Sequence, residues 1–310
     1  MSVVVFGSVN LDLTVYVDML PRPGQTIHSG RESIGLGGKG ANQAVAVQRL
    51  SRDPVRFVSA TGEDAFGAML RAELAAKSVP LHHLQRFSDV TTGIALIHVD
   101  ASSQNTITVM GGANLAWPAE GPDPAVFEGA KVALFQLETP LEATRAAMIS
   151  AKAKGARVVL DPAPVPVSVP DGLWRAADIV TPNETEAEAL LGFSPGGGSD
   201  AISAARALCR LGPEVCVIKM GARGLAYAAT DGTEGLMGPY RVDPVDTVAA
   251  GDSFNGALAV ALSEEMPLED ALRFASAAGA LATTRPGASA SAPSRAEVEG
   301  LIAQGHESAG

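Results

Sequence analysis

The fold of this chain is constrained most by an alternation of two kinds of segment. Short apolar runs rich in β-branched residues are separated by longer stretches with the periodicity of amphipathic helices. The expected strands are residues 3–7, 55–60, 131–136, 157–161, 178–181 and 215–220, and the expected helices between them are residues 41–50, 65–77, 141–155, 184–192 and 199–212. This rhythm predicts an α/β fold that is Rossmann-like, with a mostly parallel central sheet flanked by helices. Ligands of such sheets bind beyond the carboxyl ends of the strands.

Two regions break this rhythm. Residues 91–110 contain two alternating runs on either side of a polar turn at residues 100–105, which is typical of a β-hairpin. Residues 12–34 alternate in the same way around a Pro/Gly turn. Two long irregular loops are the alternative, but such loops are uncommon in compact domains, so we expect a small β-sheet that forms a lid. The expected domains are an α/β core of residues 1–11, 36–90 and 114–310 and a β-lid of residues 12–35 and 91–113.

The composition limits the classes of partner. The 310 residues include 23 Lys and Arg against 34 Asp and Glu, which gives a formal net charge of −11. An acidic chain is a poor match for nucleic acid or for an anionic membrane. No apolar run approaches the roughly 18 residues of a membrane-spanning helix, and the N-terminus lacks the features of a secretory signal. Cys209 and Cys216 match no metal or redox motif and fit reduced thiols. We therefore expect a cytoplasmic protein that binds neither nucleic acid nor a membrane.

A glycine-rich segment, 35-GLGGKGANQAV-45, is the first candidate for a ligand loop. A Walker loop would follow the lysine with Ser or Thr, and the hydroxyl that holds Mg²⁺ is absent here. Three of its glycines have the spacing G-x-G-x-x-G, but a dinucleotide fingerprint belongs in the first strand–helix turn, before the expected lid. A helix start that merely packs tightly is the third alternative. It leaves unexplained why Lys39 and Asn42 share a turn with the glycines.

The segment 246-DTVAAGDSFNGALAVAL-262 is the second candidate. Three small residues precede a strongly helical run, and Asp252 stands at its start. The first N–H groups of a helix have no intrahelical partner, and together with the helix dipole they attract an anion. Asp252 is then either an ordinary N-cap residue or a base that takes a proton from a hydroxyl attacking a bound phosphate.

Both segments resemble signatures of the ribokinase-like carbohydrate kinase family. Residues 37–42 meet its early signature, close to G-G-x-x-x-N, and residues 246–256 meet its late signature, D-T-x-x-A-G-D-x-F-x-G. The resemblance covers essentially the whole chain, since residues 7–12, 136–140, 181–188, 219–224 and 285–293 also match. It implies a nucleotide- and sugar-binding α/β domain with a small β-lid, which often forms the contact of a homodimer.

The resemblance also implies an activity, ATP-dependent phosphorylation of D-ribose at O5 to give D-ribose 5-phosphate and ADP. Asp252 would be the catalytic base, and the N–H groups of Ala250, Gly251 and Asp252 would form an anion hole for the transferring phosphoryl group. Lys39 would also face the incoming γ-phosphate. The residues that would bind the sugar are Asn10, Asp12, Gly38, Lys39, Gly40, Asn42, Glu138 and Asp252.

The same resemblance implies sites for MgATP and for a monovalent cation, usually K⁺. Asn183 would lie near the phosphates and Glu186 would orient Mg²⁺ through water, although an ordinary capped helix start explains the same residues. The nucleotide residues would be Asn183, Lys219, Gly221, Ala222, Gly224, Gly251 and Ser276. The monovalent cation would be held, mostly by backbone carbonyls, at Asp246, Val248, Ala282, Arg285, Gly287 and Ser291.

Other functions remain as alternatives. Asp12 and Glu138 favour a small pentose over a nucleoside, whereas 2-deoxyribose, which lacks one hydroxyl, stays open alongside other sugar or nucleoside kinases. A non-catalytic sugar-binding protein on the same fold would not need Asp252, Gly251 and Glu186 together. An oxidoreductase would be recognised by quenching of tryptophan fluorescence with NAD(H) but not with ATP.

Overall fold

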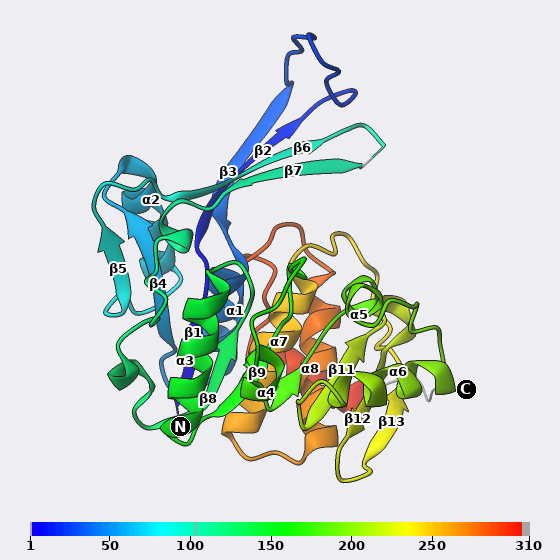
Figure 1. The fold of residues 1–310 in the computed structure, drawn as a ribbon. Helices are drawn as coiled ribbons and strands as arrows, with labels where there is room; N and C mark the ends of the chain where they lie inside the picture. Colours follow the sequence, from blue (N-terminus) through cyan, green and yellow to red (C-terminus); the bar gives the residue numbers. More distant parts are fainter. Residues whose placement is uncertain (1, 103, 306–310) are drawn as a thin grey trace.

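The computed structural model describes residues 2–102 and 104–305, and it builds two sheets from them (Figure 1). The larger sheet has nine strands in the order β13-β12-β11-β10-β9-β8-β1-β4-β5, and the smaller has four in the order β3-β2-β6-β7. The α/β fold class predicted from the sequence is confirmed.

The large sheet is parallel except at one edge, where β12 and β13 run antiparallel to their neighbours. All six expected strands are present, because each is a short apolar run that can be buried on both faces. The strands are β1 (Ser2–Phe6), β4 (Arg56–Gly62), β5 (Leu84–Phe87), β8 (Ala130–Phe135), β9 (Arg157–Leu160), β10 (Ile179–Val180), β11 (Val215–Lys219), β12 (Leu225–Ala229) and β13 (Glu234–Met237).

Helices cover both faces of this sheet and create two hydrophobic cores. Alternate residues of β1 show the division, since Val3 and Val5 belong to one core and Val4 and Phe6 to the other. On the first face lie α1 (Lys39–Leu50), α2 (Ala65–Ala76), α7 (Ala250–Ser263), α8 (Leu268–Ala282) and α9 (Arg295–Gln304). On the second lie α3 (Leu141–Ala153), α4 (Leu173–Ala176), α5 (Glu184–Leu191) and α6 (Ser199–Cys209), with the short 3-10 segments η1 (Gly112–Leu115) and η2 (Pro124–Phe127). A third 3-10 segment, η3 (Gly221–Arg223), follows β11.

The four-stranded sheet, called the small sheet below, projects from the top of the molecule in Figure 1. It comprises β2 (Asn10–Tyr16), β3 (Arg31–Gly37), β6 (Gly93–Val99) and β7 (Asn105–Met110). β6 and β7 form the expected antiparallel hairpin, and β2 pairs antiparallel with β3 and parallel with β6. These strands overlap the ranges expected for the lid, while the domain boundaries themselves stay a prediction.

The order of the strands places a crevice next to β1. The chain leaves β1 toward β4 and β5 on one side, and β8 and its successors lie on the other. A ligand binds at such a switch point, beyond the carboxyl ends of the adjacent strands. Ser8 follows β1 here, and Gln136 and Glu138 follow β8, because Phe6 and Phe135 are paired at the ends of the two strands.

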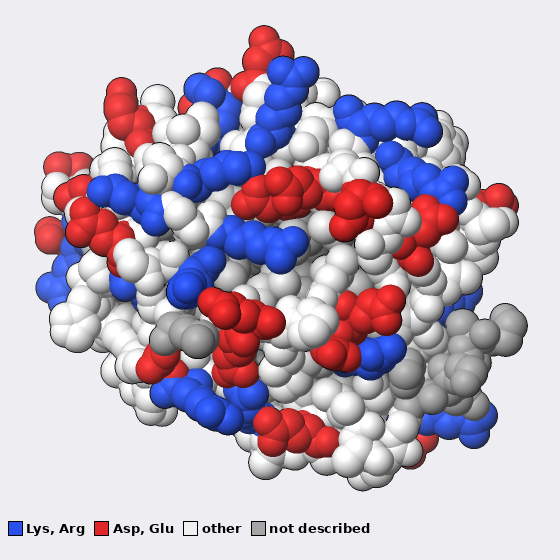
Figure 2. All heavy atoms as spheres, turned by 90° about the horizontal axis from the view of Figure 1, so that it is seen from below, with Lys and Arg blue, Asp and Glu red and all other residues white. Residues whose placement is uncertain are grey.

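The surface seen from below mixes acidic and basic side chains and gathers no broad basic patch on that face (Figure 2). Among the described residues, no helix has both the length and the apolar character needed to cross a bilayer.

Candidate functional site

A cavity of about 1030 Å³ lies beyond the carboxyl ends of β9 and β11, next to the first turn of α7. Its lining brings together eleven residues predicted from the sequence, which come from segments far apart along the chain. They are Lys39, Asn183, Glu186, Lys219, Gly221, Ala222, Gly224, Ala250, Gly251, Asp252 and Ser276. The predicted nucleotide residues therefore share one cavity with the predicted base.

Asp252 is buried in the first turn of α7, with only 5% of its surface exposed. Its Oδ2 accepts a hydrogen bond from Asn42 Nδ2 at 3.0 Å, and its Oδ1 accepts one from Gln43 Nε2 at 3.0 Å. Burial raises the pKa of Asp252 to about 6, against the opposing effect of the Lys39 ammonium. The carboxylate is therefore ionised at neutral pH but basic enough to accept a proton.

The start of α7 leaves two backbone N–H groups for an anion. The first bond back into the helix is donated by Ser253 to Ala249 at 2.9 Å, and Gly251 and Asp252 precede it, so these two N–H groups have no intrahelical acceptor. Ala250 differs from expectation, because its N–H donates to the carbonyl of Thr247 at 3.3 Å. A Cβ at Gly251 would lie 3.4 Å from Lys219 Nζ, so an ammonium group lies beside the two N–H groups.

The predicted sugar residues converge next to this cavity. Glu138 Oε2 accepts hydrogen bonds from Ser8 Oγ and from the N–H of Lys39, the latter at 2.9 Å. The carboxylate of Asp12 lies against Gly37, where a Cβ would come within 2.0 Å of Oδ2. Burial, together with Glu138 and Asp252, raises the pKa of Asp12 to about 7. Several hydrogen-bond acceptors thus face one small volume, as a polyol requires.

Lys39 is the cation at the centre of these acids. Burial alone would lower the pKa of its ammonium, but Asp252, Asp161 and other carboxylates together raise it above its usual range. The positive charge of Lys39 therefore offsets part of the negative charge of the carboxylates within the site.

Three predicted sugar residues also have a role in the fold itself. Asn10 Oδ1 accepts from Asn114 Nδ2 at 2.7 Å, which leaves the amide end of Asn10 as the donor. The N–H of Gly40 donates to Ser8 Oγ at 3.3 Å. Gly38 has φ +87° at the N-cap of α1, a conformation that favours glycine. Gly38 and Gly40 therefore shape the loop at the start of α1, while their contact with a sugar stays a prediction.

The structure shows the capped helix start at Asn183 and Glu186, while their role toward phosphates and Mg²⁺ stays a prediction. Asn183 Oδ1 accepts from the N–H of Glu186 at 2.8 Å, and Glu186 Oε2 accepts from the N–H of Asn183 at 2.7 Å, which is a capping box. Both residues also line the cavity. Burial and the nearby carboxylate of Asp161 raise the pKa of Glu186. A divalent cation with oxygen ligands would relieve this repulsion, so the acids present fit Mg²⁺.

Five of the six residues expected around a monovalent cation lie on two adjoining loops, and the sixth, Ala282, ends α8. Asp246 joins them, because its carboxylate accepts from the N–H of Val248 and from that of Gly287, each at 3.0 Å. Arg285 is ion-paired with Glu297, so only its backbone is available to a cation. Ala282 ends α8 and is buried. Ser291 is buried in the second loop, where its hydroxyl donates to the carbonyl of Ala288 at 2.8 Å. No group of three or more acidic, His or Cys side chains suited to a metal occurs among the residues described.

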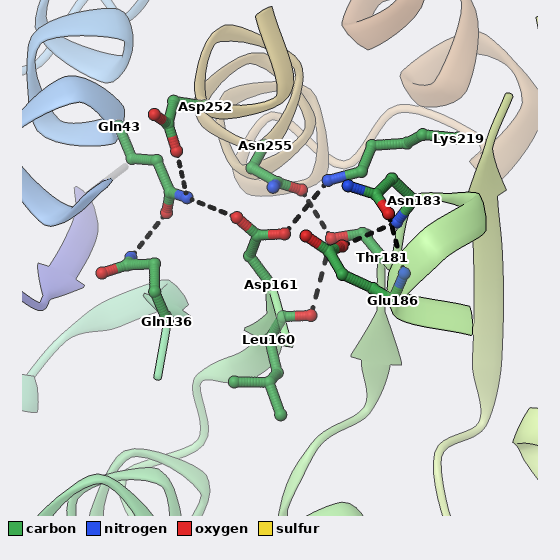
Figure 3. A network of polar contacts seen from close by, with 10 residues as sticks. All are labelled: Gln43, Gln136, Leu160, Asp161, Thr181, Asn183, Glu186, Lys219, Asp252 and Asn255. Carbon is green, nitrogen blue, oxygen red and sulfur yellow. Dashed lines mark hydrogen bonds and ion pairs between the residues drawn. The ribbon is translucent and has the colours of Figure 1, made fainter. Parts of the chain in front are cut away.

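Among the residues missed from the sequence, two buried polar side chains connect directly to the predicted site. Asp161, 2% exposed, follows β9 and accepts from Lys219 Nζ at 3.0 Å and from Gln43 Nε2 at 3.1 Å (Figure 3). Gln43 is fully buried in α1 and bridges Asp161 to Asp252. The signal for Asp161 was its place at the carboxyl end of a parallel strand. For Gln43 it was a polar residue directly before the apolar run of residues 44–47 in a helix.

Comparison with known proteins places the chain in a family. The model of the pfkB family carbohydrate kinases matches residues 1–295. The chain is similar to a ribokinase of Haemophilus influenzae, with 38% identity over 298 residues that cover 96% of each chain. It is also similar to a deoxyribokinase of Salmonella typhi, with 32% identity over 296 residues, 95% of this chain and 96% of the other. A structure of Arabidopsis thaliana ribokinase complexed with ribose and ATP has a TM-score of 0.90 and 33% identity, and covers 97% of this chain and 98% of that one. The chain therefore belongs to the pfkB family of carbohydrate kinases.

Proposed function

We propose that this protein transfers the γ-phosphate of ATP to O5 of D-ribose, giving D-ribose 5-phosphate and ADP. The observation that carries the proposal is the position of Asp252, a buried carboxylate at a helix start, between a group of acids suited to a sugar and a cavity suited to a nucleotide. The similarity to proteins named ribokinase, one of them complexed with ribose and ATP, supports the same substrates.

The reaction follows from the residues around Asp252. Its carboxylate takes the proton of the O5 hydroxyl, and the oxygen attacks the γ-phosphorus as the bond to the β–γ bridging oxygen breaks. The N–H groups of Gly251 and Asp252 and the ammonium of Lys219 stabilise the charge on the transferring phosphoryl group. Asp12, Glu138 and Asn42 hold the sugar hydroxyls so that O5 faces Asp252.

We further propose that ATP binds as MgATP and that K⁺ activates the enzyme. Glu186, with Asp161 beside it, would hold Mg²⁺ through water, and when bound the ion neutralises charge on the phosphates. The loops joined by Asp246 would hold K⁺ mainly through backbone carbonyls. The first of these loops, with Asp246 and Val248, leads directly into the first turn of α7, so a cation there would stabilise the anion hole.

A homodimer formed through the small sheet is also proposed. Both faces of this sheet carry exposed apolar side chains, Ile34 and Met110 on one face and Ile107 and Val109 on the other, between 47% and 55% exposed. Clusters of exposed apolar residues are typical of an interface. A cytoplasmic location is proposed because ATP is the substrate and because Cys209 and Cys216 are free thiols.

An ADP-release assay tests the activity. The purified protein is supplied with MgATP and either ribose, 2-deoxyribose, fructose, adenosine or uridine, in KCl or NaCl. We expect ribose to give the highest kcat/KM and K⁺ to exceed Na⁺. A preference for 2-deoxyribose would move the assignment to a deoxyribokinase, and a preference for a nucleoside would contradict the pentose site.

The role of Asp252 is tested by Asp252→Asn. Because a positioned base contributes about 10²–10⁴-fold, kcat should fall by that factor while the Kd for ATP changes little. Asp270→Asn, a surface carboxylate paired with Arg273, is the matched control and should keep full activity. Wild-type turnover by Asp252→Asn would overturn the mechanism.

A further inference from the structure

Gln43 is a fully buried side chain whose amide hydrogen-bonds at both ends. Its Nε2 donates to Asp252 Oδ1 at 3.0 Å and to Asp161 Oδ2 at 3.1 Å. Its Oε1 accepts from Gln136 Nε2 at 2.5 Å. The two N–H bonds of the amide are thus divided between two carboxylates, and Figure 3 shows the side chain standing between them.

The orientation of this amide is fixed by its partners. An ionised carboxylate can only accept, so the NH₂ end of Gln43 must face Asp252 and Asp161. The carbonyl end then needs a donor, which Gln136 supplies. Gln136 in turn is packed against the end of β1, since a Cβ at Gly7 would lie 1.8 Å from its Oε1. A sequence of contacts therefore runs from the end of β1 to the carboxylate of Asp252.

This arrangement connects the two halves of the proposed site. On the sugar side, Asp252 is also held by Asn42 through its other oxygen. On the nucleotide side, the second oxygen of Asp161 is paired with Lys219, whose ammonium lies beside Gly251. Gln43 is the group that joins these two pairs. Without it, two buried carboxylates would face each other with no shared donor between them.

We propose that Gln43 is a positioning residue of the phosphoryl-transfer reaction, which holds the carboxylate of Asp252 toward the sugar and keeps it apart from the Asp161–Lys219 pair. This inference rests on the proposed function, because it assigns Gln43 a role toward the base of that reaction. Gln43 acts only through the two carboxylates and does not itself need to contact either substrate.

The proposal has a consequence for the protonation of Asp252. The charged groups that face it are Lys39 of α1, Asp161 after β9 and Asp12 of β2. Lys39 favours the ionised form of Asp252, and the two acids oppose it. The bonds from Asn42 and Gln43 also favour the ionised form. Removing the donor from Gln43 should therefore make Asp252 easier to protonate.

The test is Gln43→Met, which keeps the volume of the side chain and removes both donors. A hydrogen bond to a charged group is worth enough to shift a pKa by about one unit. We expect the acid limb of kcat/KM to move to higher pH by about that amount and kcat at pH 7 to fall at least about tenfold. The KM values should change by less than about threefold. If Gln43 only supported the fold, Gln43→Met would lower kcat without shifting the acid limb of the pH profile of kcat/KM.

Gln48→Met is the matched control, because Gln48 is also on α1 but accepts from the N–H of Val55 at 3.0 Å. It should leave rate and pH profile unchanged. Gln136→Met is a milder variant that removes only the donor fixing the amide of Gln43, and it should shift the limb in the same direction by less. If Gln43→Met fails to fold, as judged by thermal melting, Gln136→Met decides the question.

A second readout does not depend on turnover. The carboxyl carbon of Asp252 is followed by NMR of protein labelled with ¹³C-aspartate, and its resonance is identified by its loss in Asp252→Asn. The pKa of Asp252 should be higher in Gln43→Met than in wild type. Equal pKa values and superimposable pH profiles would overturn the role of Gln43. A wild-type protein that phosphorylates no sugar would overturn the proposed function, while the titration would still test the contact.

Discussion

At the scale of single residues, the site is defined by buried carboxylates whose pKa values are raised. Burial is the main cause for both Asp252 and Asp12, with pKa values of about 6 and about 7. Because Asp252 must be ionised to accept a proton and Asp12 binds the sugar as a carboxylate, kcat/KM for ribose should be level above about pH 8, fall about tenfold per unit below about pH 7 and fall more steeply below about pH 6. Initial rates between pH 5 and 9, at constant ionic strength, measure this. A flat profile down to pH 5 would show that Asp252 titrates much lower in the protein.

Asp12 illustrates the cost of such a site to stability. Its folded pKa of about 7 lies above the ordinary 3.8, so the folded protein binds the proton more tightly than the unfolded chain. The free energy of unfolding should therefore fall as pH rises from about 4 through 7. Asp12→Asn removes the cost of ionising a half-buried carboxyl group in the folded protein. It should raise the free energy of unfolding by on the order of 1–3 kcal/mol at pH 8, with little effect at pH 4.

Urea unfolding at the two pH values measures that difference, and Asp18→Asn, an exposed carboxylate two residues after the end of β2, serves as control. An Asp12→Asn protein that is less stable at pH 8 would contradict the account. The same variant should bind ribose less tightly, since Asn offers one acceptor where the carboxylate offers two.

At the scale of elements, the start of α1 and the end of β1 touch without side chains between them. A Cβ at Gly40 would come within 2.6 Å of Gly7 C and Ser8 N, both backbone atoms that cannot rotate away. Gly40→Ala should therefore push α1 from the sheet and lower the free energy of unfolding by about 1–3 kcal/mol. It should also lower kcat, because Asn42 and Gln43 are carried by the same helix turn. Gly35→Ala, where nothing lies within 4 Å, is the control, and equal stability of the two variants would be inconsistent with this contact.

The elements also show what could be predicted from the sequence. Strands such as β1 and β9 were found because both are short apolar runs buried on both faces. Strand β12 and the edge strand β13 were not, since LAYAA is alanine-rich and EGLM is short and partly exposed, so neither has a strong strand pattern.

In the site, motifs identified Asp252 and Asn42, but the contacts of Gln43 could not be predicted in the same way. Its partners Asp161 and Asp252 lie 118 and 209 positions further along the chain. Their meeting depends on the tertiary fold, which brings α1, the end of β9 and the start of α7 to one point. The residue type alone gave no indication of which partners it would find.

At the scale of the whole molecule, the proposed active site lies where the carboxyl ends of the strands of the large sheet meet the small sheet. The large sheet places Glu138 and Asp161 at the ends of neighbouring strands, and the small sheet supplies Asp12 from β2. Helices of the first hydrophobic core, α1 and α7, bring Lys39 and Asp252 to the same point. In the proposed function, sugar binding therefore depends on how firmly the small sheet holds Asp12 above the core.

A contact with a partner subunit in the proposed dimer would hold the small sheet in place. Val109 pairs across Ala95 with Asp12, so Ile107 and Val109 lie on the face that carries Asp12. A partner subunit that covers this face would hold Asp12 over the sugar.

The variant Ile107→Glu places a charge in the proposed interface and should convert the dimer to a monomer. Light scattering after gel filtration measures the change in mass. The KM for ribose should rise several-fold more than the KM for ATP, because the nucleotide cavity is built from other elements. Val167→Glu, at a fully exposed loop position outside the small sheet, should remain dimeric. A wild-type protein that is monomeric at micromolar concentration, or an Ile107→Glu dimer, would contradict this interface.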